Sequence, residues 1–149
     1  MHGTKCRIET LQLSELTELQ HASFDQQTSK TVQLHDLPKI TWLTCSLIHA
    51  DEVRQVTLRG LPRLQTLKMI PINADGSIEQ IPYVAKIDDE LLTEVAAMPW
   101  LESLELTHTA IHDTALPQLA ALPKLRSVTI TGPNVSPEAL QQLRESLRR

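Results

Sequence analysis

Histidine, cysteine and carboxylate side chains are the groups in this chain that could bind a metal ion or take part in catalysis. His108 and His112 are four residues apart, a spacing that on a helix would bring both rings to one metal ion. The surrounding LELTHTAI alternates like a strand and its exit, so the rings are not expected to converge. In NADGSIE, the Asp75-Gly76 pair suits a calcium loop, but the position six residues after the glycine holds Pro82 instead of a carboxylate. The sequence therefore predicts neither a metal site nor a cofactor.

Known catalytic motifs are also missing from the sequence. It contains no G-x-S-x-G, Walker, C-x-x-C or dinucleotide-binding pattern, and its four glycines are too scattered to cradle a phosphate. Of the two cysteines, Cys6 and Cys45, the second occupies a position held elsewhere by Leu, Met and Ile, which predicts a free buried thiol. We therefore expect the protein not to be an enzyme. The remaining alternative is an active site assembled from scattered residues such as His21, Asp25 and Cys45.

Length and charge narrow the class of protein. The 149 residues suit one domain with a sizeable core, and 41% of them are hydrophobic. Lysine and arginine number 14 against 18 aspartates and glutamates, a net charge of −4, so a nucleic-acid partner is not expected. No apolar run reaches the length of a membrane span, and Glu9, Glu15 and Glu18 interrupt any signal peptide. We expect a cytoplasmic protein without a membrane partner.

The elements that must position these side chains are repeated along the chain. Four stretches share one pattern, LPKITWLTC, LPRLQTLKM, MPWLESLEL and LPKLRSVTI, and a weaker copy is LTELQHASF. The last position of the four falls at Cys45, Met69, Leu106 and Ile130, with spacings of 24, 37 and 24 residues. A period of this size is typical of stacked units that share one core. We therefore predict that residues 43–45, 67–69, 104–106 and 128–130 are neighbouring parallel strands.

The stretch LESLELTHTAI resembles the leucine-rich repeat family, whose signature is L-x-x-L-x-L-x-x-N/C-x-L. The resemblance implies a short horseshoe-shaped solenoid of class α/β with a parallel concave sheet. It also implies a single domain, residues 1–149, of about five repeats with an insertion at 70–87. At the asparagine position of the signature, Thr109 is the residue whose hydroxyl could take over the hydrogen bonds. Most such repeats are interaction domains, so the resemblance implies protein binding.

The segments that return the chain between repeats are of two kinds. In the first half, ETLQLSEL, KTVQLHDL and QVTLRGL alternate as short strands do. In the second half the apolar spacing is helical, so we predict a change from extended to helical near residue 88. Pro117 predicts that the middle helix is short or partly 3₁₀. Ser136 and Pro137 suit the start of a C-terminal capping helix, predicted over residues 137–149.

Side chains that flank the apolar positions of each strand face the opposite side of the sheet. Their columns contain His21 beside Trp42, and Lys68 beside Glu105 if the insertion loops out. Trp42 is either an exposed hot spot for binding or is covered by the insertion or by the His21 ring. Lys68 and Glu105 are expected to pair with each other. Trp100 is expected to be partly exposed on the turn entering its strand, where it aligns with three cationic residues, Lys39, Arg63 and Lys124.

The insertion IPINADGSIEQIPYVAKI is the largest departure from the repeat. It leaves its strand at Ile70, at the rim of the predicted concave face, and the expected rim residues include Asp75 and Tyr83. Two interpretations remain open. The loop either contributes to a binding site or packs on itself and shields the aliphatic core.

The predicted function is a protein–protein interaction module that binds a protein or peptide through its concave face and insertion rim. The alternative is a structural or self-associating scaffold, or a spacer domain of a larger assembly. This alternative rests on the ends of the stack, because the chain offers a polar helix at its C-terminal end and no polar cap before CRIETLQL. Self-association would then use the uncapped N-terminal end.

Overall fold

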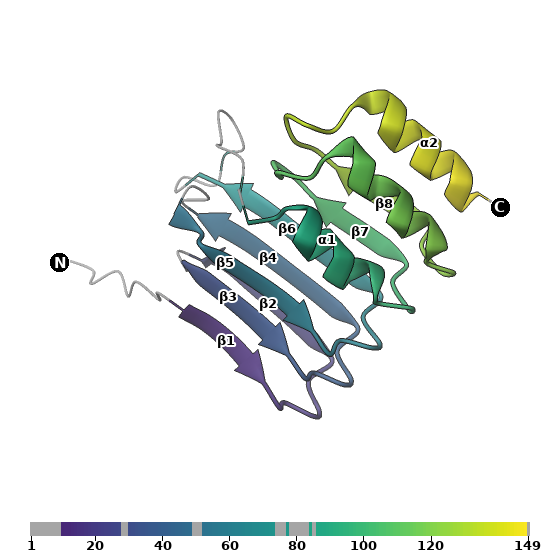
Figure 1. The fold of residues 1–149 in the computed structure, drawn as a ribbon. Helices are drawn as coiled ribbons and strands as arrows, with labels where there is room; N and C mark the ends of the chain where they lie inside the picture. Colours follow the sequence, from purple (N-terminus) through teal and green to yellow (C-terminus); the bar gives the residue numbers. More distant parts are fainter. Residues whose placement is uncertain are drawn as a thin grey trace.

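The computed structural model describes residues 10–27, 30–48, 52–73, 77, 84 and 86–148 of the protein. These residues form a mixed α/β structure of two parallel sheets and three helices, and neither sheet closes into a barrel within the described ranges. The elements lie in two layers, with β1 and α2 at opposite ends of the molecule (Figure 1).

Each layer contains one sheet. Sheet A has the order β1-β3-β5, with β1 at Thr10–Ser14, β3 at Thr31–His35 and β5 at Gln55–Arg59. Sheet B has the order β2-β4-β6-β7-β8, with β2 at His21–Gln27, β4 at Trp42–Ile48, β6 at Thr66–Ile72, β7 at Ser103–Leu106 and β8 at Ser127–Ile130. All strand pairs are parallel.

The register of sheet B follows the sequence repeat. Cys45 pairs with Met69, which pairs with Leu106, which in turn pairs with Ile130. The prediction of neighbouring parallel strands is therefore confirmed. The longer spacing between the middle copies does not shift the register, because the extra residues leave the ladder after β6 and return before β7.

Five units of equal length build both layers. They are residues 10–27, 31–48, 55–72, 89–106 and 113–130, and each begins with an element of the first layer and ends with a strand of sheet B. The main contacts of each element run to the equivalent elements of the preceding and following units. Stability in such a stack depends on the interfaces between neighbours.

The first layer changes from strands to helices between the third and fourth units. Its helices are α1 at Asp89–Ala96, the 3₁₀ helix η2 at Asp113–Ala121 and α2 at Pro137–Leu147. Asp88 caps α1 by accepting a hydrogen bond from the Leu91 amide at 3.1 Å, which confirms the predicted change near residue 88. The 3₁₀ geometry around Pro117 is also confirmed, since proline lacks the amide that an α-helix interior requires.

The edge of sheet A is closed by α1. The Glu94 carboxylate accepts a hydrogen bond from the Leu58 amide at 2.8 Å and pairs with Arg59 Nε at 2.9 Å. It therefore takes the place of the strand that would otherwise bond to β5.

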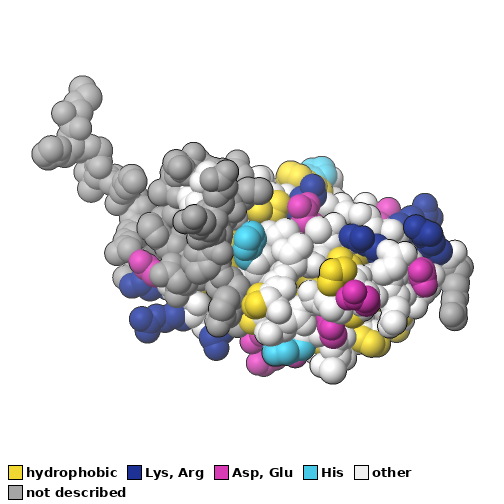
Figure 2. Space-filling model, turned by 90° about the horizontal axis from the view of Figure 1, so that it is seen from above, with side chains coloured by type: hydrophobic (Ala, Val, Ile, Leu, Met, Phe, Trp, Pro, Cys, Tyr) yellow, Lys and Arg dark blue, Asp and Glu magenta, His cyan; other side chains and the backbone are white. Residues whose placement is uncertain are grey.

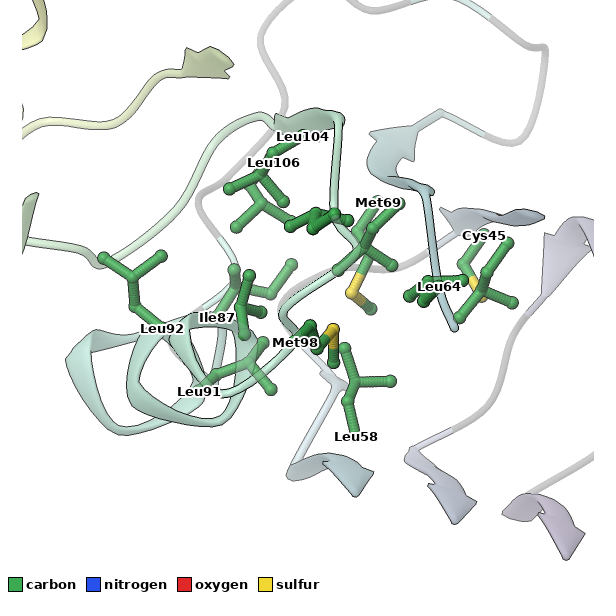
Figure 3. Close-up of a cluster of buried hydrophobic side chains, with 14 of the residues drawn as sticks. Cys45, Leu58, Leu64, Met69, Ile87, Leu91, Leu92, Met98, Leu104 and Leu106 are labelled. Atoms are coloured by element: carbon green, nitrogen blue, oxygen red, sulfur yellow. The ribbon is translucent and has the colours of Figure 1, made fainter. Parts of the chain in front are cut away.

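The core lies between the two layers and is aliphatic (Figure 3). Leu64, Leu67, Met69 and Ile87 are fully buried, and they pack with side chains from both layers. Cys45 is also fully buried, and burial raises the pKa of its thiol to about 12. The prediction of a free buried cysteine is confirmed, and a thiol with so high a pKa does not act as a nucleophile near neutral pH.

The chain leaves each strand of sheet A through the same backbone conformation. Glu15, Asp36 and Gly60 follow β1, β3 and β5, and their φ angles are 58°, 57° and 65°. Only glycine adopts this left-handed conformation at little cost. A Cβ atom at Gly60 would also lie 2.9 Å from the Asp36 amide nitrogen, so this turn has no room for a side chain.

Two carboxylates tie successive helical units together. Asp89 accepts hydrogen bonds from the His112 amide at 2.8 Å and lies 2.9 Å from the His112 ring. One unit later, Asp113 accepts bonds from the amide and the hydroxyl of Ser136, both at 2.7 Å. The backbone hydrogen bond from Ser136, followed by its hydroxyl, holds the pKa of Asp113 below its usual value.

This lowered pKa predicts acid sensitivity. Because the Asp113 carboxyl has a lower pKa folded than unfolded, its contribution to stability is present above the unfolded pKa and is lost as the pH falls through the folded pKa. Urea unfolding between pH 6 and about pH 2.5 should therefore show a smaller loss of stability for Asp113→Asn than for the wild type. Glu138→Gln, at an exposed carboxylate of α2, serves as the control. Equal pH dependence in wild type and Asp113→Asn would contradict this assignment.

Candidate functional site

The face of sheet B that points away from the core carries mostly small polar side chains. Along each strand, buried apolar residues alternate with partly exposed ones, so the second set shares the outer face. The described helices belong to the other layer (Figure 1). The outer-face residues are His21, Ser23, Trp42, Thr44, Ser46, Thr66, Lys68, Ile70, Ser103, Glu105, Thr107, Ser127, Thr129 and Thr131.

Trp42 is the largest side chain on this face. The His21 ring packs edgewise against it, with ring centroids 6.4 Å apart and an interplanar angle of 69°. This contact leaves the indole 37% exposed. Among the described residues, the two predicted neighbours do lie together, and His21 supports the indole without covering it.

Lys68 and Glu105 lie opposite each other on β6 and β7. Lys68 Nζ lies 3.3 Å from Glu105 Oε2, which confirms the predicted pair. Such cross-strand pairs contribute about 0.2–1 kcal/mol. Each charge is therefore balanced on this face, and a ligand would meet a neutral pair rather than a free cation or anion.

Thr44 occupies the middle of the face, beside Lys68 in the register. Its hydroxyl oxygen is buried and has no hydrogen-bond partner in the described part of the chain. Most buried polar atoms have a hydrogen-bond partner, and one without a protein partner is accounted for by strain, by a functional role or by a bound water or ion. This unpaired hydroxyl could not be predicted from the sequence, because threonine is a common residue on strands.

The two ends of the insertion join the core. Ile70 is half-buried inside β6, which continues through the buried Pro71 to Ile72 in register with β4, so the prediction that the insertion leaves its strand at Ile70 is wrong by two residues. At the far end, the Val84 amide donates to the His108 carbonyl at 2.6 Å, and Val84 and Ile87 are fully buried. These contacts favour the shielding interpretation for the ends of the loop. The predicted rim residues Asp75 and Tyr83 lie outside the described residues.

The strand exit after β7 has a buried polar centre. The Thr109 hydroxyl donates to the Thr131 carbonyl at 3.1 Å and accepts from the Ile111 amide at 3.3 Å. Thr109 thus makes the hydrogen bonds expected of its position. His112 pairs with Asp89, and no cluster of three or more His, Cys, Asp or Glu side chains suited to a metal occurs in the described ranges.

Trp100 forms a second exposed aromatic site that the predicted site residues did not include. It is 45% exposed, and Lys124 Nζ lies 3.5 Å from the centre of its ring. The repeat itself contained the signal, since Trp100 and Lys124 occupy the same turn position in successive units. The two side chains become neighbours because β7 and β8, the strands that follow them, pair in register.

The face of the molecule seen in Figure 2 shows no dominant charge among its described residues. Figure 2 shows acidic and basic side chains interspersed and hydrophobic side chains in small separate groups over its coloured part. Within the described residues, no helix has the length and apolar character needed to cross a membrane.

Comparison with protein-family models, with curated proteins and with solved structures finds no significant match to this chain.

Proposed function

We propose that the protein is a recognition module that binds a protein or peptide on the outer face of sheet B, next to the ends of the insertion. We further propose that its units form a short leucine-rich-repeat-like solenoid in which this face is concave. The observation that carries the proposal is Trp42, a 37% exposed indole among mostly small polar side chains on the outer face of sheet B. Exposed aromatics that a neighbour holds in place are enriched among binding hot spots.

The surroundings of Trp42 support a peptide partner. Ser and Thr hydroxyls on adjacent strands can donate and accept hydrogen bonds, and the parallel ladder holds them rigidly in place. A rigid surface loses little entropy on binding, which favours affinity. Because Lys68 and Glu105 neutralise each other, the best ligand is a largely uncharged segment with an apolar side chain for the indole.

The experiment is to select peptides from a random display library on the wild-type protein and then titrate them against variants. Trp42→Ala should weaken the selected peptides by about tenfold or more, which corresponds to a typical hot-spot loss. Thr66→Arg, which places a long charged side chain beside Trp42 in the register, should block them as well.

Glu138→Gln, on α2 in the other layer, is the matched control and should leave the affinities unchanged. Peptides that bind Trp42→Ala and Thr66→Arg as tightly as the wild type would overturn the proposal that this face is the binding surface.

A second candidate function, self-association, is favoured by the N-terminal end of the stack. Leu16 is 44% exposed there, whereas its equivalent Leu37 is fully buried. Leu11 and Leu13 are only partly buried, whereas their register partners Val32 and Leu34 are fully buried. No strand among the described residues pairs with the outer edges of β1 and β2.

If a second copy covers this end, light scattering should show a dimer that dissociates on dilution. Leu16→Glu should remain a monomer, because it places a charge in the apolar interface without disturbing a buried site. Ala120→Glu, at an exposed position of η2, should dimerise like the wild type. A wild-type protein that is monomeric at millimolar concentration would exclude this function.

A further inference from the structure

A pocket lies on the turns that enter the strands of sheet B, away from the face described above. Its volume is about 280 Å³, and it is lined by Thr41, Arg63, Gln65 and Trp100. We call it the turn pocket. Backbone hydrogen bonds between successive units hold these turns in place. The Thr41 carbonyl accepts a bond from the Gln65 amide, and the Gln65 carbonyl accepts one from the Glu102 amide, both at 2.8 Å.

One face of the Trp100 indole is already occupied. Lys124, from the following unit, lies 3.5 Å above the ring centre. Trp100 lines the turn pocket with residues of earlier units, whereas Lys124 belongs to the following unit. We infer from this arrangement that the indole face opposite Lys124 is the one turned toward the pocket. A cation on one face reduces the negative potential of the ring, which makes the opposite face more favourable for an electron-rich or anionic group.

Arg63 provides the charge of the turn pocket. Its side chain is exposed and makes no hydrogen bond or ion pair with the described residues. The hydroxyl of Thr41 is committed to the Gln20 carbonyl at 3.2 Å. Glu102 is the neighbour of Gln65 in the next unit and donates its amide to the Gln65 carbonyl, but its side chain does not line the pocket. Among the residues that line the pocket, Arg63 therefore carries the one full charge, and its guanidinium is free to bind a ligand. A guanidinium binds a carboxylate through two parallel hydrogen bonds.

We propose that the turn pocket binds an aromatic ring that bears a carboxylate one or two bonds away. The ring would stack on the open face of Trp100, and the carboxylate would pair with Arg63. The volume suits one six-membered ring with its acid group. Such a group could belong to a small aromatic acid or to the C-terminal aromatic residue of a polypeptide.

The test uses ¹H–¹⁵N NMR of the whole protein, with phenylacetate as the probe. The amides of Gln65 and Glu102 and the indole N–H of Trp100 should shift in a saturable manner. Acetate, which lacks the ring, and benzylamine, which has the opposite charge, should bind at least about tenfold more weakly if both groups are recognised. Equal binding of phenylacetate and benzylamine, or no saturable shift, would overturn the proposal.

Two variants separate the roles of the lining residues. Arg63→Gln should weaken phenylacetate by about tenfold while leaving benzyl alcohol unchanged, because only the charged pair is lost. Trp100→Ala should abolish binding of both. Arg126→Ala, an exposed arginine outside the pocket, is the matched control. Phenylacetate affinities that are the same in wild type and Arg63→Gln would overturn the assignment.

A third arm distinguishes the sources of the ligand. Tighter binding of the peptide Ala-Ala-Phe with a free C-terminus than of phenylacetate would identify a polypeptide end, and equal or weaker binding would identify a small acid. Trp42→Ala should not alter any of these affinities, so failure here is distinguishable from failure of the proposed sheet-face function.

Discussion

Leu67→Ala should lower the free energy of unfolding by about 2–5 kcal/mol, the range measured for large-to-small substitutions in closely packed cores. Leu67 is fully buried in β6, the middle strand of sheet B, and its register partners are Leu43 and Leu104. The substitution would leave a cavity at the centre of the stack. The neighbouring strands β4 and β7 are both hydrogen-bonded to β6, so they cannot move inward to fill it. Urea denaturation monitored by circular dichroism measures the change.

Leu13→Ala is the matched control for position in the stack. It removes the same atoms from β1, the end strand of sheet A, where the side chain is only partly buried. Its cost should be clearly smaller than that of Leu67→Ala, since less surface is lost from the core. A cost as large as that at Leu67 would contradict the exposed N-terminal end and would indicate that something covers it in solution.

Gly132→Ala should destabilise the protein by about 1–3 kcal/mol or more, as overpacking of a filled site does. A Cβ atom at Gly132 would clash with the Thr109 carbonyl oxygen and would lie 3.1 Å from the Thr109 hydroxyl. The backbone must shift to relieve this contact, because a carbonyl oxygen cannot rotate away. That shift would strain the bond from the Thr109 amide to the Thr131 carbonyl, now 2.8 Å long.

Asn134→Ala, two residues further along the same exposed turn, separates this effect from a general sensitivity of the loop. It should change stability by less than about 0.5 kcal/mol, as surface substitutions usually do. Thermal denaturation of both variants gives the comparison. A Gly132→Ala protein as stable as Asn134→Ala would show that the turn after β8 does not pack against Thr109.

The strands of sheet B were predictable because their apolar positions recur at matching places. One column of side chains, from Cys45 to Ile130, sets the register, and a shift by one residue would turn that column to solvent. The change to helices was also predictable, since the spacing of Leu91, Leu92 and Val95 suits only a helix. These features depend on local pattern and on burial.

The contacts that depend on the distance between two particular side chains were harder to predict. Glu94 closes the edge of sheet A by bonding to the Leu58 amide. In the sequence, nothing distinguishes it from the other glutamates expected on the exposed faces of helices. Asp89 and Asp113 differ from other first-turn acids only because the next unit presents an amide at the right distance. The pairing of Trp42 with His21 was predictable from the shared column, whereas its 37% exposure depended on packing.

The arrangement of the five units has a mechanical consequence. The first and last units lie at opposite ends, and each unit is held mainly by its neighbours, so tension applied to β1 and α2 acts across the sheet ladders. The hydrogen bonds between two parallel strands would then open one after another instead of shearing together. A unit together with the segment that joins it to the next spans 24 residues in the regular copies, such as Cys45 to Met69. Its opening would release about 80 Å of extended chain. Under tension the protein would therefore lengthen in discrete steps, one unit at a time.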